Sequence, residues 1–211
     1  MNKEEFLKEL EKLGINVTSK QLEQLEQFYN LLVEWNKKIN LTRITEKEDV
    51  YLKHFYDSLT IVKAVNLKDI NTLCDIGTGA GFPGIVLKIF YSHLKITLID
   101  SLRKKVDYLN TIIKEMGLDN IEAIHVRGED YKGSFDVVTS RAVANIEKLV
   151  NYTMHLVSKN GVFVAMKGDI DKELTPEVEK KINKKYEILE VKKFLLPKEN
   201  SNRSLVVLSN K

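Results

Sequence analysis

Hydrophobic positions follow two different periods along this chain, and the change comes near residue 66. Before that point apolar residues recur every three or four positions, as at Leu22, Leu25 and Phe28, which is the spacing of amphipathic helices. Beyond it, short apolar runs alternate with helical stretches, which is typical of a doubly wound α/β domain. We therefore predict a helical extension over residues 1–66 and an α/β domain over residues 67–211.

Capping patterns place the helices of the extension. A first helix over residues 2–13 ends before a glycine, and Thr18 with Gln21 forms the capping-box pattern that begins a second, longer helix. The same pattern at Thr45 and Glu48 predicts the start of a third.

The third predicted helix carries His54 and Asp57 close together. His54 could carry a proton. A lone histidine beside aromatic residues is more often a structural hydrogen-bonding group, so both interpretations stay open at this point.

The most informative stretch begins at Asp75 and reads D-I-G-T-G-A-G-F. Gly77, Gly79 and Gly81 separate an apolar run from a helical pattern, so they form a bend where a ligand can reach the backbone and the free N–H groups of a helix start. The dinucleotide fingerprint G-x-G-x-x-G needs one more residue between its second and third glycines. With Phe82 after it, this stretch resembles the first motif of Rossmann-like S-adenosylmethionine-dependent methyltransferases.

The remaining pattern predicts a seven-stranded sheet. Short apolar runs indicate buried strands at 70–76, 94–99, 121–126, 135–138 and 161–166, with final strands at 186–194 and 204–208. The short connection between the last two favours an antiparallel pair. Thr175, followed by Pro176, predicts a helix before them. A mostly parallel sheet with an antiparallel terminal strand is typical of the Rossmann-like methyltransferase fold.

Asp100 ends the second predicted strand, about twenty residues beyond the glycine loop, where a carboxylate grips the ribose hydroxyls of a cofactor. This position would serve the ribose of NAD equally well. A nicotinamide-dependent oxidoreductase therefore stays open as an alternative enzyme.

Ligands of open α/β sheets bind at the carboxyl ends of the strands, which here also supply Ser101, Leu102, Gly128, Glu129 and Arg141. We expect the glycine loop to meet the amino-acid part of the cofactor, and Glu129 or its neighbouring backbone to meet the adenine amino group. Arg141, placed beyond the fourth strand, would position the methyl acceptor.

Two sequence features that other kinds of methyl transfer need are missing, and this narrows the choice of methyl acceptor. The fourth strand is followed by Thr139 to Ala142 in place of the Pro-Pro-aromatic box usual in methylation of exocyclic amino groups. Attack on C5 of a pyrimidine needs a cysteine nucleophile, and the single cysteine, Cys74, lies inside a buried strand. Guanine N7 already carries a free lone pair, so its methylation requires alignment and little acid–base help. We expect no dedicated catalytic acid or base.

Composition describes a globular protein. The chain has 211 residues, 43% hydrophobic and 30% charged, with a net charge of +3. No apolar run is long enough to span a bilayer and the first residues are too acidic for a signal peptide, so we expect a cytoplasmic protein without membrane contact. One cysteine allows no intrachain disulfide and, without a nearby ligand set, no metal site.

Three motifs are similar to the methyltransferase G family of bacterial 16S ribosomal RNA, formerly the glucose-inhibited division protein B family. They are L-C-D-I-G-T-G-A-G-F-P-G from Leu73, I-D-S-L-R-K-K-V from Ile99 and T-S-R-A-V-A from Thr139. W-N-K-K-I-N-L-T from Trp35 and H-F-Y-D-S-L from His54 are similar too, so the resemblance covers essentially the whole chain.

The resemblance implies S-adenosylmethionine-dependent methylation of N7 of one guanosine in 16S rRNA, without a covalent intermediate. It carries cofactor contacts to Gly77, Phe82, Asp100, Ser101, Leu102, Gly128, Glu129 and Arg141, and it makes Arg103, Lys104, Arg127 and Lys167 candidates for RNA contacts. Gly128 stands where the family usually has alanine. The expected partner is 16S rRNA or an assembling small subunit, and the chain is expected to be a monomer without metal. A noncatalytic RNA-binding module that retains the cofactor loop is the remaining alternative.

Overall fold

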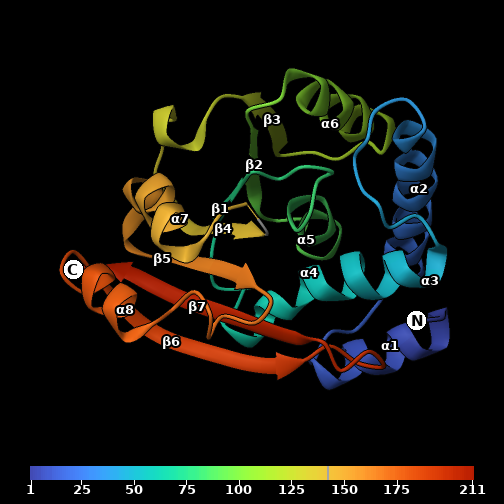
Figure 1. Cartoon of the computed structure of the whole chain (residues 1–211). Helices are drawn as coiled ribbons and strands as arrows, with labels where there is room; N and C mark the ends of the chain where they lie inside the picture. Colours follow the sequence, from blue (N-terminus) through green and yellow to red (C-terminus); the bar gives the residue numbers. More distant parts are fainter. Residues whose placement is uncertain (142) are drawn as a thin grey trace.

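A seven-stranded sheet forms the centre of the molecule (Figure 1). The structure is a computed structural model that describes residues 1–141 and 143–211. The strand order is β3-β2-β1-β4-β5-β7-β6. The strands are β1 (Thr72–Ile76), β2 (Lys95–Asp100), β3 (Ile121–His125), β4 (Phe135–Arg141), β5 (Val157–Lys167), β6 (Tyr186–Leu195) and β7 (Asn202–Asn210). The pairs β5–β7 and β7–β6 are antiparallel and the other pairs are parallel among the described residues, which confirms the predicted fold class.

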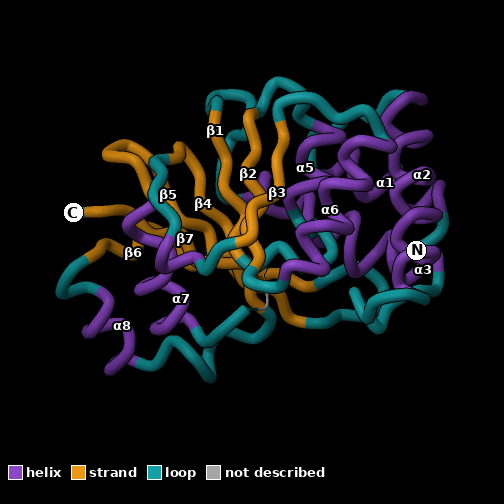
Figure 2. The backbone as a smooth tube through the Cα atoms, turned by 90° about the horizontal axis from the view of Figure 1, so that it is seen from above, coloured by secondary structure: helices purple, strands orange, loops and turns teal. Residues whose placement is uncertain are grey.

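Helices cover both faces of the sheet (Figure 2). The α-helices are α1 (Lys3–Lys12), α2 (Ser19–Asn36), α3 (Lys47–Val50), α4 (Asp57–Leu59), α5 (Gly84–Phe90), α6 (Arg103–Glu115), α7 (Ile146–Thr153) and α8 (Pro176–Ile182). Short turns are η1 (Tyr51–Tyr56), which is π-helical, and the 3₁₀ turns η2 (Thr60–Lys63), η3 (Gly128–Asp130) and η4 (Met154–Leu156). Together α3, η1, α4 and η2 form one helical run from Lys47 to Lys63, where the sequence predicts a helix.

Successive side chains of a strand point to opposite faces of the sheet, so neighbouring residues of β1 pack against different helices. Leu73 of β1 belongs to the hydrophobic cluster that includes α2, α5 and α6, whereas its neighbour Cys74 belongs to the cluster that includes α7. Phe28 of α2 and Ile85 of α5 are fully buried in the first cluster. The N-terminal helices therefore share a hydrophobic core with the sheet, and the predicted domain boundary at residue 66 stays a prediction.

Local signals placed two of the three predicted caps correctly. Thr18 and Gln21 form the predicted capping box, and the Thr175 hydroxyl accepts a hydrogen bond at the start of α8, with Pro176 in the first position. The Thr45 cap is wrong: α3 begins after Glu46, and the Thr45 carbonyl instead accepts a hydrogen bond from Tyr29 Oη. The pattern is short, and here the tertiary contact takes precedence.

The fourth strand is longer than predicted. Pairing with β5 continues to Arg141, which lies opposite Met166, so Arg141 is the last residue of β4 and does not lie beyond it. This long partner strand extends a run that local hydrophobicity ends at Val138. Ala142, the next residue of that motif, lies outside the described residues.

Candidate active site

The glycine loop between β1 and α5 has the backbone that its composition indicates. Gly77, Gly79 and Gly81 have φ values of +67°, +61° and +96°, in the left-handed region that favours glycine. A Cβ on Gly77 would lie 2.4 Å from Val143 Cγ2. The β4–α7 connection thus packs directly on the loop, where a side chain would not fit.

Asp100 joins the loop to the end of β2. Its Oδ2 accepts a hydrogen bond from the Gly79 N–H at 3.0 Å, and its Oδ1 accepts one from the Leu102 N–H at 2.9 Å. Lys105 Nζ lies 3.7 Å from Oδ2. The structure therefore brings three predicted cofactor residues into direct contact, and their neighbour Ser101 is exposed beside them.

Gly128 and Glu129 lie at the end of β3, as predicted. A Cβ on Gly128 would lie 2.9 Å from Cγ2 of Ile76, so η3 packs against the end of β1. Glu129 is exposed and lies 3.6 Å from Arg127 across an ion pair. The carboxyl ends of β1, β2 and β3 thus form one continuous edge.

Asp75 is a fully buried carboxylate below this edge. Oδ2 accepts hydrogen bonds from Thr78 Oγ1 at 2.7 Å and from the Gly84 N–H at 2.9 Å, while Oδ1 has no partner among the described residues. Burial raises the pKa of Asp75 to about 6, and the Arg141 charge opposes part of that shift. An unpartnered carboxylate oxygen, Asp75 Oδ1, beside the glycine loop suits a cofactor that carries positive charge.

Arg141 is held by the helical run of the N-terminal segment. Its Nη1 donates to the Lys53 carbonyl at 3.0 Å and to Asp57 Oδ2 at 3.2 Å, and its Nη2 lies 3.1 Å from His54 Nδ1. The guanidinium carbon lies 5.2 Å from the centre of the Phe82 ring. These contacts fix Arg141 at the point where the glycine loop meets the N-terminal helices.

The contacts of His54 define its role. A guanidinium can only donate, so Nδ1 accepts from Arg141 and the proton sits on Nε2, which lies 2.9 Å from Thr42 Oγ1. Burial and the Arg141 charge lower the pKa of His54 to about 3. The ring also stacks on Phe82 with centroids 4.3 Å apart. Of the two interpretations of His54, the geometry supports the structural one.

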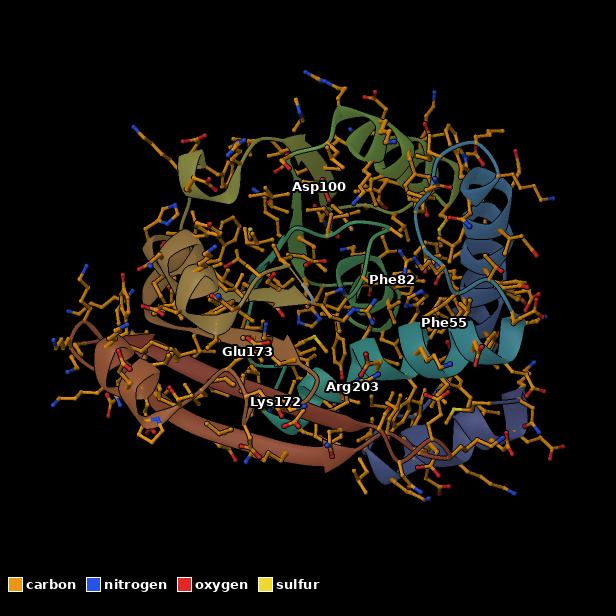
Figure 3. All side chains as sticks on the ribbon, viewed as in Figure 1. Phe55, Phe82, Asp100, Lys172, Glu173 and Arg203 are labelled. Carbon is orange, nitrogen blue, oxygen red and sulfur yellow. The ribbon has the colours of Figure 1, made fainter. Side chains whose placement is uncertain are left out.

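Phe82 is buried within an aromatic cluster. Besides His54 it lies 5.2 Å from the Phe28 ring and 6.2 Å from the Phe55 ring, between centroids. Figure 3 shows Phe82 between Asp100 and Phe55 of the helical run. The motif residue after the glycines thus anchors the loop to the N-terminal helices.

The sequence does not predict two of the charged residues at the site. Arg203, at the start of β7, donates through Nε to Asp57 Oδ1 at 2.9 Å, so Asp57 bridges two guanidinium groups. Glu173, in the connection after β5, pairs with Lys167 at 2.8 Å. Their partners are distant in sequence or belong to loops, so neither periodicity nor a motif indicates them.

The predicted RNA contacts separate into two groups. Arg103, Lys104 and Arg127 are exposed. Lys167 has a side chain only 6% exposed, and it donates to the Ala144 carbonyl and pairs with Glu173. Its environment is that of a pocket wall, unlike the open surface of the other three.

The described part of the chain has neither a membrane-spanning helix nor a metal-binding cluster. No helix in residues 1–141 and 143–211 is long and apolar enough to cross a membrane. Within the same residues, no group of three or more His, Cys, Asp or Glu side chains could hold a metal ion.

Solved structures similar to this one share its fold. A StiE O-MT aligns with a TM-score of 0.63 at 14% identity, covering 84% of this chain and 81% of that one. Pyrococcus horikoshii TYW2 in complex with MeSAdo aligns with a TM-score of 0.55 at 13% identity, covering 72% and 60%. At these identities the likeness shows the methyltransferase fold alone.

Sequence comparisons identify the family. The family model for rRNA small subunit methyltransferase G matches residues 21–206. Ribosomal RNA small subunit methyltransferase G of Bacillus subtilis is 43% identical over 99% of this chain and 90% of its own length, and that of Bacillus licheniformis is 46% identical over the same shares. The chain therefore belongs to the rRNA small subunit methyltransferase G family.

Proposed function

We propose that this chain transfers a methyl group from S-adenosylmethionine to N7 of a guanosine in 16S rRNA, with the cofactor bound between the glycine loop and Asp100. Family membership supports the reaction and the RNA class. The observation that carries the location is the direct hydrogen bonding of Asp100 to Gly79 and Leu102 at the ends of β1 and β2. The substrate places the reaction in the cytoplasm, and we expect a metal-free monomer.

The residues at this edge fit the cofactor. Bound there, it supplies an electrophilic methyl group on a sulfonium sulfur. The backbone of Gly77 and Gly79 would receive its amino-acid part, Asp100 its ribose hydroxyls, and Glu129 its adenine amino group. Exposed Leu102, 46% accessible, would cover one face of the adenine.

The reaction requires the protein to align the methyl donor with guanine N7, and it involves no proton transfer. The N7 lone pair forms the new bond to the methyl carbon while the carbon–sulfur bond breaks, and the positive charge passes from the sulfur to the purine. No proton leaves N7, so no general base is needed. A neutral His54 locked at both ring nitrogens agrees with such a site.

Methyl transfer to rRNA tests the function. Purified protein is incubated with tritiated S-adenosylmethionine and 16S rRNA from a strain lacking this methylation, and the modified nucleoside is identified by mass spectrometry. We expect 7-methylguanosine. Absence of incorporation would favour the noncatalytic RNA-binding module, and tight NADH binding without S-adenosylhomocysteine binding would favour the oxidoreductase.

Asp100→Ala is expected to weaken binding of S-adenosylhomocysteine by about 1.5 to 3 kcal/mol, the range for hydrogen bonds to a charged group. Isothermal titration calorimetry measures the dissociation constant. The control is Asp107→Ala, which removes an exposed carboxylate from α6 and should leave binding unchanged. A thermal unfolding midpoint shows whether removing the hydrogen bonds from Gly79 and Leu102 unfolds the protein. An unchanged dissociation constant in folded Asp100→Ala would remove Asp100 from the site.

RNA binding is expected to weaken steeply with salt, because lysines and arginines displace counterions from the phosphates. The double variant Arg103→Gln, Lys104→Gln should reduce the slope of log K against log salt by about 1 for each phosphate that the variant no longer neutralises. Lys159→Gln, at an exposed position of β5, is the control. Fluorescence anisotropy with a labelled 16S fragment measures the slope. Equal slopes for wild type and the double variant would make this basic cluster incidental.

A further inference from the structure

A cavity of about 600 Å³ lies beside the proposed cofactor site, between the helical run Lys47–Lys63, the ends of β4 and β5, and the start of β7. Arg141 and Val143 belong to its wall, and Val143 also packs on Gly77 of the glycine loop. The cavity therefore adjoins the glycine loop. Its volume is in the range of small-molecule sites, which suits a single nucleotide and not a duplex.

The wall of the cavity combines apolar and charged groups. Met166, Phe194 and Leu205 supply apolar surface. Four cationic side chains face two carboxylates, since Lys53, Arg141, Lys167 and Arg203 line it together with Asp57 and Glu173. Lys53 is also paired with Asp49 at 3.1 Å and Glu199 at 2.7 Å, and Lys167 is paired with Glu173, so the two guanidinium groups are the cations that can meet a ligand. Guanidinium groups beside apolar surface suit a base that carries its phosphate.

The two guanidinium groups meet at Asp57. This carboxylate is shared between the guanidinium groups of Arg141, at 3.2 Å, and Arg203, at 2.9 Å. The charge of buried Asp75 also acts on Arg141, so the positive charge that stays unbalanced in the cavity wall belongs to Arg203. A phosphate of the bound nucleotide would neutralise it.

Glu173 presents an acceptor of fixed orientation. Its Oε2 accepts a hydrogen bond from the Ile146 N–H at 2.9 Å and forms an ion pair with Lys167 Nζ at 2.8 Å. Within residues 1–141 and 143–211, its Oε1 has no hydrogen-bond partner. Glu173 and Arg203 both line the cavity, and Figure 3 shows them below Phe82, with Asp100 above it.

Among the RNA bases, guanine matches this acceptor. Its N1–H and 2-amino group are adjacent donors, and a carboxylate oxygen has two acceptor sites to receive both. Adenine would bring the unprotonated N1 against the carboxylate, which repels it. Methylation at N7 leaves the N1–H and 2-amino edge of the base available for this recognition.

We propose that this cavity takes one guanosine nucleotide extruded from the RNA, with Glu173 accepting from N1–H and the 2-amino group and Arg203 facing its phosphate. The proposal rests on the proposed function, since it names the acceptor pocket of that reaction. It makes Glu173 the residue that selects guanine.

Two RNAs that differ at one atom group test Glu173. Short 16S fragments carry either guanosine or inosine at the methylated position, and inosine lacks the 2-amino group. Wild type is expected to methylate the guanosine RNA with a kcat/KM about tenfold or more above that of the inosine RNA. This comparison requires no variant.

Glu173→Gln reverses the polarity facing the base. The Ile146 N–H donates to Oε2 and the Lys167 ammonium lies beside it, so we expect the amide oxygen to take the place of Oε2 and the NH₂ group to take the place of Oε1 in the cavity wall. A donor then meets two donors. We expect kcat/KM on the guanosine RNA to fall about tenfold or more, and the guanosine preference to shrink to about threefold or less. Glu179→Gln, on exposed α8, is the matched control and should keep both values.

Cofactor binding separates this proposal from the function on which it rests. Glu173→Gln should bind S-adenosylhomocysteine with the wild-type dissociation constant, which also shows that it is folded. If wild type methylates both RNAs equally, or if folded Glu173→Gln keeps the guanosine preference, the assignment of Glu173 is overturned while the methyltransferase function stands. If wild type methylates no RNA, the function fails and the pocket assignment fails with it.

Discussion

Asp57→Asn is expected to lower the free energy of unfolding by about 3 to 5 kcal/mol, the cost of breaking a buried charge network by removing one partner. Asp57 is 6% exposed and compensates both Arg141 and Arg203. Asparagine keeps the shape but leaves the two guanidinium groups without the carboxylate that they share. Methyl transfer should fall too, because Arg141 loses one of its anchors. Urea unfolding measures the change.

The control for this substitution is Asp49→Asn. Asp49 belongs to the same helical run, but its side chain is 45% exposed and its pair with Lys53, at 3.1 Å, lies in solvent. Exposed pairs contribute about 1 kcal/mol or less. If the two substitutions cost the same, the Arg141–Asp57–Arg203 network contributes no more than a surface ion pair.

His54 is expected to make the protein lose stability on the acid side of neutrality. An unfolded histidine has a pKa of about 6.5, whereas the folded pKa is about 3 because burial and the Arg141 charge disfavour the imidazolium. Between these values the unfolded state binds more protons, so stability falls as the pH falls. The full difference is on the order of 5 kcal/mol, of which about 2 kcal/mol is lost between pH 7.5 and pH 5.

Asp75 contributes the opposite slope. Its folded pKa, about 6, lies above that of an exposed aspartate, so its contribution to stability is lost as the pH rises through 6. The two slopes partly cancel in the wild type. The informative quantity is therefore the difference between wild type and a variant in which Asp75 is unchanged.

His54→Asn supplies that difference, because an amide oxygen can still accept from Arg141 and does not titrate. Urea unfolding at pH 7.5 and at pH 5 should show wild type losing about 2 kcal/mol more than this variant. His155→Asn, at an exposed histidine, should behave like wild type. A wild-type pH profile parallel to that of His54→Asn would mean that His54 is not held neutral.

The sequence predicted the glycine loop and Asp100, whose positions depend on local structure. The glycines need positive φ, and Asp100 follows a buried run, so composition and periodicity place both at strand ends. The Arg203–Asp57 pair joins residues 146 positions apart, and no period or cap indicates such a contact. The Thr45 cap and the early end of β4 failed for a related reason, since a tertiary hydrogen bond and a long partner strand overrode the local pattern.

The π-helical turn Tyr51–Tyr56 has a consequence for exchanging parts between relatives. Lys53 and His54 of this turn, and Asp57 directly after it, all contact Arg141, so the last residue of β4 depends on a segment more than 80 positions earlier in the chain. In a chimera that joins the N-terminal helices of one homologue to the sheet of another, Arg141 and the residues that contact it come from different proteins. Compatible pairs must match at these positions, and a one-residue deletion within the turn would displace these contacts while leaving the glycine loop and Asp100 unchanged in sequence.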